Sequence, residues 1–207
     1  MTKIDYKKDY KDIYLPKQKP SIIKLEPMKY VTIEYLGDPS DSKYQSVMSA
    51  LYGFAYTIKM KSKKRDDYYE YVVFPLEGIW DLQDYSLDKL EKSNFKATMM
   101  IRQPDFVDEK LFEEYREVLL SKEQDQAVIK RIESAKLEII DEDLCVQILH
   151  IGSYDDEPAS FALMEQFCQE NGYRRLSKVH KEIYLSDPRK VSKDKLKTVL
   201  RFKVEKL

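Results

Sequence analysis

Glycine, cysteine and tryptophan are scarce in this chain, and it has no long apolar run. Its 207 residues include 5 Gly, 8 Pro, 2 Cys and 1 Trp, a composition that excludes collagen-like and low-complexity chains. No stretch approaches the ~18 consecutive apolar residues that a membrane helix needs. The polar N-terminal sequence also lacks the apolar core of a signal peptide. We therefore expect a cytoplasmic protein that makes no membrane contact.

An excess of one charge and the common cofactor motifs are absent as well. Lys plus Arg number 36 against 37 for Asp plus Glu, and no helix-turn-helix pattern is present, so we expect no direct nucleic-acid binding. The widely spaced Cys145 and Cys168 predict two free buried thiols. Without a phosphate loop, a dinucleotide fingerprint or an H-E-x-x-H motif, we expect no cofactor and no metal.

The first half of the chain shows clear hydrophobic periodicities after a polar start. Residues 1–27 are rich in Lys, Asp and Tyr, and we interpret them as a poorly ordered or surface-draped N-terminal arm. Residues 28–36 alternate as in a strand, and residues 44–58 repeat at the spacing of an amphipathic helix. Residues 68–80 and 95–103 are again strand-like.

The second half repeats this order after an acidic segment. Residues 108–134 carry an apolar stripe at helical spacing, so we predict one connecting helix there. After it, the pattern predicts a strand over 144–152 and a helix over 159–172. Two final strands are predicted over 178–185 and 196–207.

An internal repeat relates the two halves. YVTIEYLGDPSD aligns with CVQILHIGSYDD, and FPLEGIW with VHKEIYL, which places Glu77 opposite Glu182. We predict an α+β fold of two pseudo-symmetric strand–helix–strand–strand repeats, with antiparallel sheets, helices on one side and a central ligand groove. The expected domain covers residues 28–207. Within it, the predicted parts are repeat one over 28–104, the connector over 105–135 and repeat two over 136–207.

The second repeat resembles the GyrI-like small-molecule-binding family, and with the internal repeat the resemblance covers residues 28–207. The resemblance rests on His-x-Gly-x-Tyr at residues 150–154 and on Glu-Ile-Tyr-Leu-Ser-Asp-Pro at residues 182–188. The family includes effector-binding domains of AraC- and MerR-type multidrug regulators. It also includes stand-alone proteins, similar in length to this chain, that hydrolyse the cyclopropane ring of DNA-alkylating compounds. Ser153 departs from the family pattern, in which Pro is usual, and we expect this to affect only the turn.

The resemblance implies a carboxylate on the central strand at Glu182. His180 and Tyr184 share its predicted face, while a strand glutamate without this resemblance is usually solvent-exposed. We take Glu182 and its repeat counterpart Glu77 as the predicted catalytic residues. Aromatic residues at helical spacing usually form core, and a single Trp often does. The alternative is a ligand-binding aromatic cage, for which the candidates are Trp80, Tyr71, Tyr52, Tyr56, Phe161, Tyr184 and Tyr154.

Three functions are compatible with these residues. The first is binding of bulky aromatic compounds, with cations favoured by Glu182. The second is hydrolysis of electrophilic, cyclopropane-bearing compounds, with Glu182 or Glu77 acting on a water. The third is ligand sensing on behalf of a separate DNA-binding or topoisomerase partner. His150 and His180 have no partner at a catalytic spacing, so we interpret both as structural. The internal two-fold repeat is compatible with a functional monomer.

Overall fold

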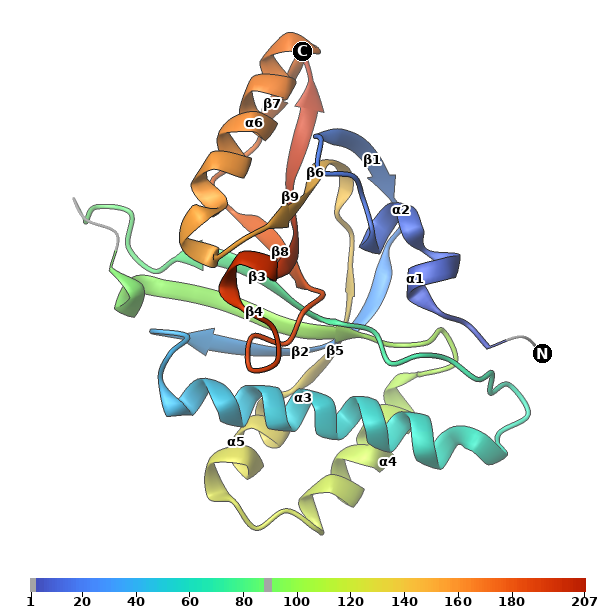
Figure 1. Cartoon of the computed structure of the whole chain (residues 1–207). Helices are drawn as coiled ribbons and strands as arrows, with labels where there is room; N and C mark the ends of the chain where they lie inside the picture. The colour runs from blue at the N-terminus through green and yellow to red at the C-terminus, as the bar shows by residue number, and fades with distance from the viewer. Residues whose placement is uncertain (1–2, 88–90) are drawn as a thin grey trace. The chain divides into compact units, whose positions relative to one another are not determined.

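The protein is described from a computed structural model, coloured along the chain in Figure 1, that covers residues 3–87 and 91–207. The described residues combine α-helices with antiparallel strands, which confirms the predicted α+β class. No helix in this part of the chain is long and apolar enough to cross a membrane.

The chain divides into two compact units, which we call the first and second unit. The first contains Met28–Phe74 and Trp80–Ile140. The second contains Asp5–Pro27, Pro75–Ile79 and Asp141–Leu207. The second unit therefore includes residues 5–27 of the segment predicted as an N-terminal arm, together with the beginning of β3 (Leu76–Leu82).

The first unit is an antiparallel sheet covered by helices. Its strands run in the order β4 (Phe95–Arg102), β2 (Met28–Leu36) and β5 (Lys136–Ile140). The helix α3 (Ser42–Lys61) lies along these strands and buries Val47, Leu51 and Phe54, among others (Figure 1). The periodicities of 28–36 and 44–58 thus identify the strand and the helix that build this unit.

Two helices, not one, follow β4. α4 (Glu109–Leu120) and α5 (Gln126–Ser134) are separated by a short break, so the prediction of a single helix over 108–134 is wrong in its middle. The carboxylate of Asp125 accepts a hydrogen bond from the amide of Ala127 at 2.8 Å. An acidic side chain that caps a new helix in this way competes with continuation of the old one.

The second unit contains the other strands, in the order β1 (Ser21–Leu25), β6 (Asp143–Ile151), β9 (Lys197–Lys206) and β8 (His180–Tyr184), with β7 (Tyr173–Arg175) beside β9. The helix α6 (Glu157–Glu170) packs on one face of β6 and β9. Side chains alternate along a strand, so every second residue of β6 and β9 contributes to this core. Its buried members are Val146, Ile148, Met164, Cys168, Leu200, Phe202 and Val204.

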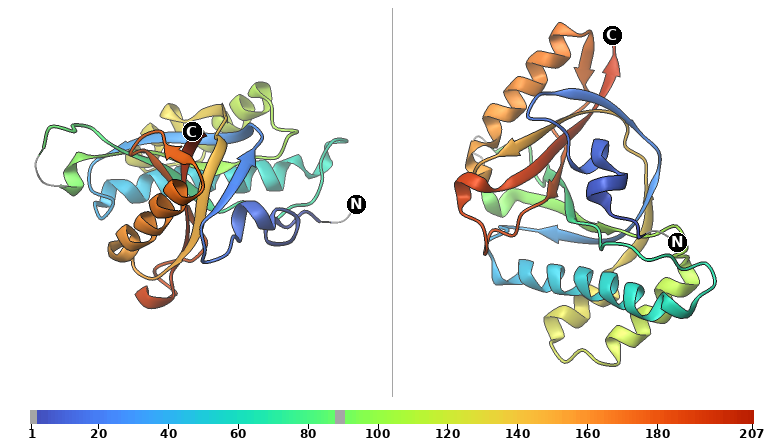
Figure 2. Two further views of the ribbon diagram at one scale, coloured as in Figure 1. Left: turned by 90° about the horizontal axis from the view of Figure 1, so that it is seen from above. Right: turned by 45° about the vertical axis from the view of Figure 1, so that its right-hand side comes forward.

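The opposite face of β6 and β9 is covered by the N-terminal segment (Figure 2). This segment forms two single-turn helices, α1 (Tyr6–Asp9) and α2 (Lys11–Tyr14), and Tyr14 is fully buried. The expectation of a poorly ordered or surface-draped arm therefore differs from the structure. The reason is tertiary: main-chain carbonyls of the segment accept hydrogen bonds from Gln147 and Arg201, which no local sequence pattern reveals.

Candidate functional site

Strand β8 directs consecutive side chains into two different environments. In its antiparallel pairing with β9, Glu182 lies opposite Leu200 and Lys181 lies opposite Arg201. Directly opposed residues of an antiparallel pair project to the same face. Because Leu200 belongs to the core beneath α6, Glu182 lies on the α6 face, together with His180 and Tyr184. Lys181 lies on the face covered by the N-terminal segment.

The Glu182 carboxylate is held by two neighbours on its own strand. The Tyr184 hydroxyl donates a hydrogen bond to Oε2 of Glu182 at 2.8 Å. Nε2 of His180 lies 3.1 Å from Oε1, a contact in which the ring nitrogen donates. The side chain of Glu182 is 11% exposed, so its carboxylate is shielded but within reach of the surface.

A second carboxyl group, from the first residue of α6, meets Glu182. Glu157 is buried, and a side-chain hydrogen bond joins its carboxyl group to that of Glu182. Burial raises the pKa of Glu157 to about 10, and the charge and hydrogen bond of Glu182 act in the same direction. Glu157 is therefore protonated at neutral pH.

Aromatic rings flank this pair of acids. The rings of Tyr154 and Tyr184 meet edge to face with centroids 6.1 Å apart, and Phe161 meets the His180 ring at 4.8 Å. Burial raises the pKa of Tyr154 to about 12, and the charge of Glu182 adds to this effect. We call this group the Glu182 cluster; its members are Tyr154, Glu157, Phe161, His180, Glu182 and Tyr184.

The cluster unites four of the residues singled out in the sequence: Tyr154, Phe161, Glu182 and Tyr184. It also contains two that were not chosen as site residues. His180 was interpreted as structural, although the alternation of β8 places it beside Glu182. Glu157 was missed because an acid at a helix start is usually a solvated residue that favours the helix dipole. The only sequence signal was its place three residues after the end of the His-x-Gly-x-Tyr motif.

The other predicted cage residues belong to the first unit. Trp80 is buried edge to face against Phe95, with ring centroids 5.7 Å apart. Tyr71 is buried in an aromatic cluster that includes Phe106, with centroids 6.3 Å apart. Tyr52 and Tyr56 stack on the exposed face of α3 at 6.3 Å. A ligand-binding role for these residues stays a prediction.

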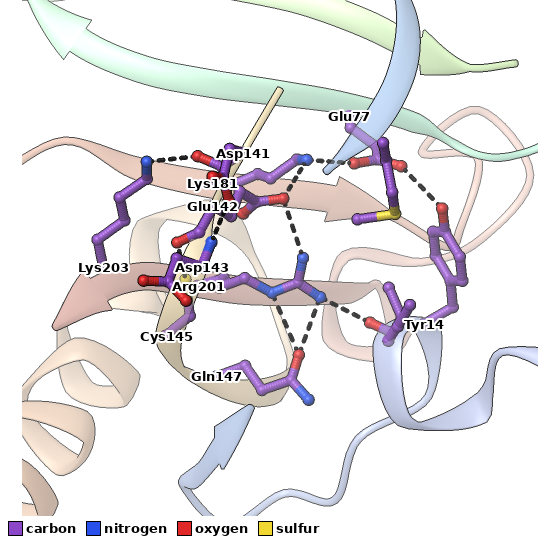
Figure 3. Close-up of polar contacts among 12 residues, drawn as sticks. Tyr14, Glu77, Asp141, Glu142, Asp143, Cys145, Gln147, Lys181, Arg201 and Lys203 are labelled. Carbon is purple, nitrogen blue, oxygen red and sulfur yellow. Dashed lines mark hydrogen bonds and ion pairs between the residues drawn. The ribbon is translucent and has the colours of Figure 1, made fainter. Parts of the chain in front are cut away.

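Glu77 lies in a buried network of charges in the second unit, shown in Figure 3. Nζ of Lys181 forms ion pairs at 2.7 Å with Oε2 of Glu77 and at 2.7 Å with Oε2 of Glu142. The hydroxyl of Tyr14 donates to Oε1 of Glu77 at 3.2 Å. The carboxylate of Glu77 thus has a buried cation as its partner, and its catalytic role stays a prediction.

Arg201 extends this network to the N-terminal segment. Its guanidinium contacts Oε2 of Glu142 at 3.3 Å, Oε1 of Gln147 at 2.9 Å and the carbonyl of Ile13 at 2.9 Å. Burial alone would raise the pKa of Glu142, but Lys181 and Arg201 outweigh it and lower the pKa. Each charged group of this network lies next to a group of opposite charge, so none of the four charges is buried without a partner.

The histidine of the His-x-Gly-x-Tyr motif has a structural position. Both ring nitrogens of His150 are bonded, Nδ1 to the Ser160 hydroxyl at 2.9 Å and Nε2 to the Ser153 carbonyl at 2.9 Å. Gly152 has φ +146°, and a Cβ built there would lie 3.3 Å from Nε2 of His150. The motif therefore sets the turn that leads into α6 and so places Glu157 next to Glu182.

Two surface hollows lie elsewhere, in the first unit. One of about 620 Å³ is lined mainly by charged residues such as Glu109, Arg116 and Glu133, and one of about 370 Å³ by Lys43, Lys130 and others. Small-molecule sites usually have few charged groups, whereas charged side chains make up at least half of the residues that line each of these hollows. No group of three or more metal-ligating side chains occurs among residues 3–87 and 91–207. Both cysteines are free and buried, as predicted.

Comparison with known proteins identifies the family. The sequence profile of the GyrI-like small molecule binding domain matches residues 18–205. The chain belongs to this family. The resemblance seen over residues 28–207 of this GyrI-like chain is thereby confirmed, and the match begins ten residues earlier.

Solved structures resemble this GyrI-like chain over its full length. An uncharacterized conserved protein from Listeria innocua is 38% identical, with a TM-score of 0.89, and covers 98% of this chain and 100% of its own. A hydrolase from Listeria innocua is 37% identical, with a TM-score of 0.87 and the same coverage. The C-terminal domain of EcmrR, at 14% identity and a TM-score of 0.54, covers 91% and 98% and shares the fold alone. A search of curated proteins gives no match.

The cluster gives this GyrI-like chain a defined chemical capacity. The carboxyl group of Glu182, the protonated carboxyl group of Glu157 and two hydrogen-bonding rings converge beside apolar aromatic edges. A carboxylate of this kind can attract a cation or accept a proton from water. The neighbouring acid can donate one.

Proposed function

We propose that this protein binds flat aromatic compounds at the Glu182 cluster and adds water to electrophilic ones, in particular compounds that carry a strained cyclopropane ring. The observation that carries the proposal is the Glu182 carboxylate, fixed by His180 and Tyr184 at 3.1 and 2.8 Å and flanked by aromatic rings. Membership of a small-molecule-binding family and 37% identity to a Listeria innocua hydrolase support it.

Binding energy would come mainly from the rings. Burial of apolar area contributes roughly 25 cal/mol per Å², so a flat aromatic compound that buries 150–200 Å² gains about 4–5 kcal/mol before the cost of immobilisation. The partly exposed rings of Phe161 and Tyr154 supply such surface. The Glu182 carboxylate adds an attraction for compounds with positive charge.

Hydrolysis would need only positioning and a base. Glu182 takes a proton from a water molecule while the oxygen of that water forms a bond to the strained ring carbon. The hydrogen bonds from His180 and Tyr184 fix the carboxylate, so a bound electrophile and the water meet in a reactive orientation. Ring strain supplies much of the driving force.

The decisive experiment is incubation of the purified chain with a panel of aromatic compounds that includes cationic dyes and a cyclopropyl dienone alkylator. Mass spectrometry detects the water-addition product, and calorimetry measures binding. We expect multiple turnovers with the alkylator. Glu182→Gln should retain binding and lose about 10²–10⁴-fold in turnover, the usual contribution of a general base.

The controls separate the two parts of the proposal. Glu170→Gln removes an exposed carboxylate from α6, outside the cluster, and should match the wild-type protein. Equal loss of binding and turnover in Glu182→Gln would contradict the role as base. Binding without product in the wild-type chain would leave a binding protein. A pull-down with and without ligand would then test the regulatory alternative.

A further inference from the structure

Glu157 is a buried acid that the reaction described above does not use. It is 6% exposed, and its Oε1 receives no hydrogen bond from any donor in the described part of the chain. A buried, unsatisfied carboxyl oxygen is costly, so such groups usually have a partner or a function. The carboxyl group of Glu157 meets that of Glu182, the residue that anchors the cluster.

The surroundings of Glu157 decide its protonation state. Its place at the start of the 14-residue α6 favours the ionised form by about 0.3–1 kcal/mol, less than one pKa unit. Burial and the carboxylate of Glu182 act in the opposite direction, with a smaller contribution from Asp155, and they raise the pKa to about 10. The effect of the helix dipole on the pKa is therefore outweighed, and the carboxyl group of Glu157 keeps its proton at neutral pH.

Other ionisable groups surround the pair without neutralising it. His180 and Tyr184 of β8 bond to Glu182, and the charge of Asp187 in the following loop acts on Tyr154. Within the turn before α6, Asp156 accepts a hydrogen bond from Ser153. On β6, both nitrogens of His150 are engaged elsewhere. Glu182 is the charged neighbour with which Glu157 shares a hydrogen bond.

We propose that Glu157 is the acid partner of Glu182: it donates its proton to the oxygen on which negative charge develops as the strained ring opens. This inference rests on the proposed hydrolysis and assigns a catalytic residue to it. Pairs of carboxyl groups in different environments divide acid and base roles in this way.

The step balances. Glu182 takes one proton from water, and the water oxygen forms a carbon–oxygen bond to the ring carbon. The carbon–carbon bond of the cyclopropane breaks, and its electron pair moves through the conjugated system to the carbonyl oxygen. That oxygen takes the proton of Glu157. Glu182 then returns its proton to Glu157 through the hydrogen bond that joins them, and the net change is addition of one water.

The first test is Glu157→Gln with the cyclopropyl dienone as probe. Glutamine keeps the size and a hydrogen-bond donor toward Glu182 but cannot release a proton. We expect nearly unchanged binding and a 10²–10⁴-fold lower kcat. In the wild-type chain kcat should fall as the pH rises through about 10, and in Glu157→Gln this alkaline limb should be absent. Glu170→Gln on the same helix is the matched control.

The second test needs no substrate. Infrared spectroscopy of the wild-type chain at pH 7 should show the carbonyl stretch of one protonated carboxylic acid, which disappears on titration through about pH 10. The band should be absent in Glu157→Gln and present in Glu170→Gln. Lack of this band in the wild-type chain would overturn the inference even if Glu157→Gln failed to fold.

The outcomes separate this inference from the proposed function. If the wild-type chain turns over the probe and Glu157→Gln does so equally fast, the acid role is wrong and the hydrolase proposal stands. If the wild-type chain turns over no compound, the hydrolase proposal falls and the catalytic role falls with it. The infrared band would still show whether the two acids share a proton.

Discussion

Lys181 and Glu182 are consecutive residues of β8, and their side chains enter different environments. Nζ of Lys181 lies 2.7 Å from both Glu77 and Glu142 in a network closed to solvent. The carboxylate of Glu182 is bonded to Tyr184 and His180 on the other face. One strand thus supplies a structural cation, Lys181, and a candidate catalytic residue, Glu182. The ion pairs that hold Lys181 in place also hold the backbone that positions Glu182.

The hydroxyl of Tyr184 should matter for turnover more than for folding. Tyr184→Phe removes a charge-assisted hydrogen bond at 2.8 Å, worth about 1.5–3 kcal/mol to a fixed carboxylate. We expect kcat on the cyclopropyl dienone to fall by about 10–100-fold, which is the same energy expressed as a rate. Tyr173→Phe, which removes a hydroxyl from β7 outside the cluster, is the control. Equal effects of the two changes would contradict an anchoring role for Tyr184.

Removal of Lys181 should destabilise the chain severely. Lys181→Met leaves Glu77 without its cation and Glu142 with Arg201 alone. Loss of one member of a buried ion pair typically costs about 3–5 kcal/mol. Urea unfolding followed by circular dichroism measures the loss. Lys203→Met, an exposed change on β9, should cost less than about 0.5 kcal/mol, and a similar small cost for Lys181→Met would show that the network is dispensable.

Tyr14 should contribute to the stability of the folded chain as a residue of the hydrophobic core does. Its side chain is fully buried and hydrogen-bonded to Glu77, so Tyr14→Ala should cost about 3–5 kcal/mol, as for other buried aromatic residues. Tyr10→Ala removes a half-buried tyrosine from the same segment and should cost much less. Thermal unfolding compares the two variants. An unchanged melting temperature in Tyr14→Ala would show that the segment contributes nothing to stability.

The proton on Glu157 should appear in the pH dependence of stability. From its ordinary value of 4.5, the pKa rises to about 10 on folding. Between these values the folded chain holds one proton more than the unfolded chain does, so the free energy of unfolding falls as the pH rises, by up to about 1.4 kcal/mol per unit. Below about pH 4.5 both the folded and the unfolded chain hold this proton, so ionisation of Glu157 does not affect stability. Above about pH 10 both have lost it, and the full cost of burying the ionised carboxylate lowers the free energy of unfolding.

Urea unfolding of the wild-type chain and Glu157→Gln at pH 6 and pH 9 would measure this effect. The variant has no proton to exchange and should lose less stability across the interval. Parallel pH profiles would contradict the shift, and Glu170→Gln should follow the wild-type chain.

Periodicity in the sequence predicts the elements that position the site, because it depends only on which face of a strand or helix is buried. The alternation of β8 placed Glu182 and Tyr184 on one face, and the internal repeat pointed to Glu77. The partner of Glu77 could not be predicted, because Lys181 and Tyr14 reach it through tertiary contacts. For the same reason the sequence could not predict the pairing of Glu157 with Glu182, which belong to a helix and a strand far apart in the chain.

The contact between Arg201 and the carbonyl of Ile13 has a consequence for the folding reaction. The two residues lie 188 positions apart along the chain, so their hydrogen bond closes a very long loop. Closure of such a loop carries an entropic cost that local contacts do not repay early in folding. On a ribosome, the contacts of this segment therefore form in stages: Glu77 and Gln147 are available before β9 is made, and the bond from Arg201 closes last.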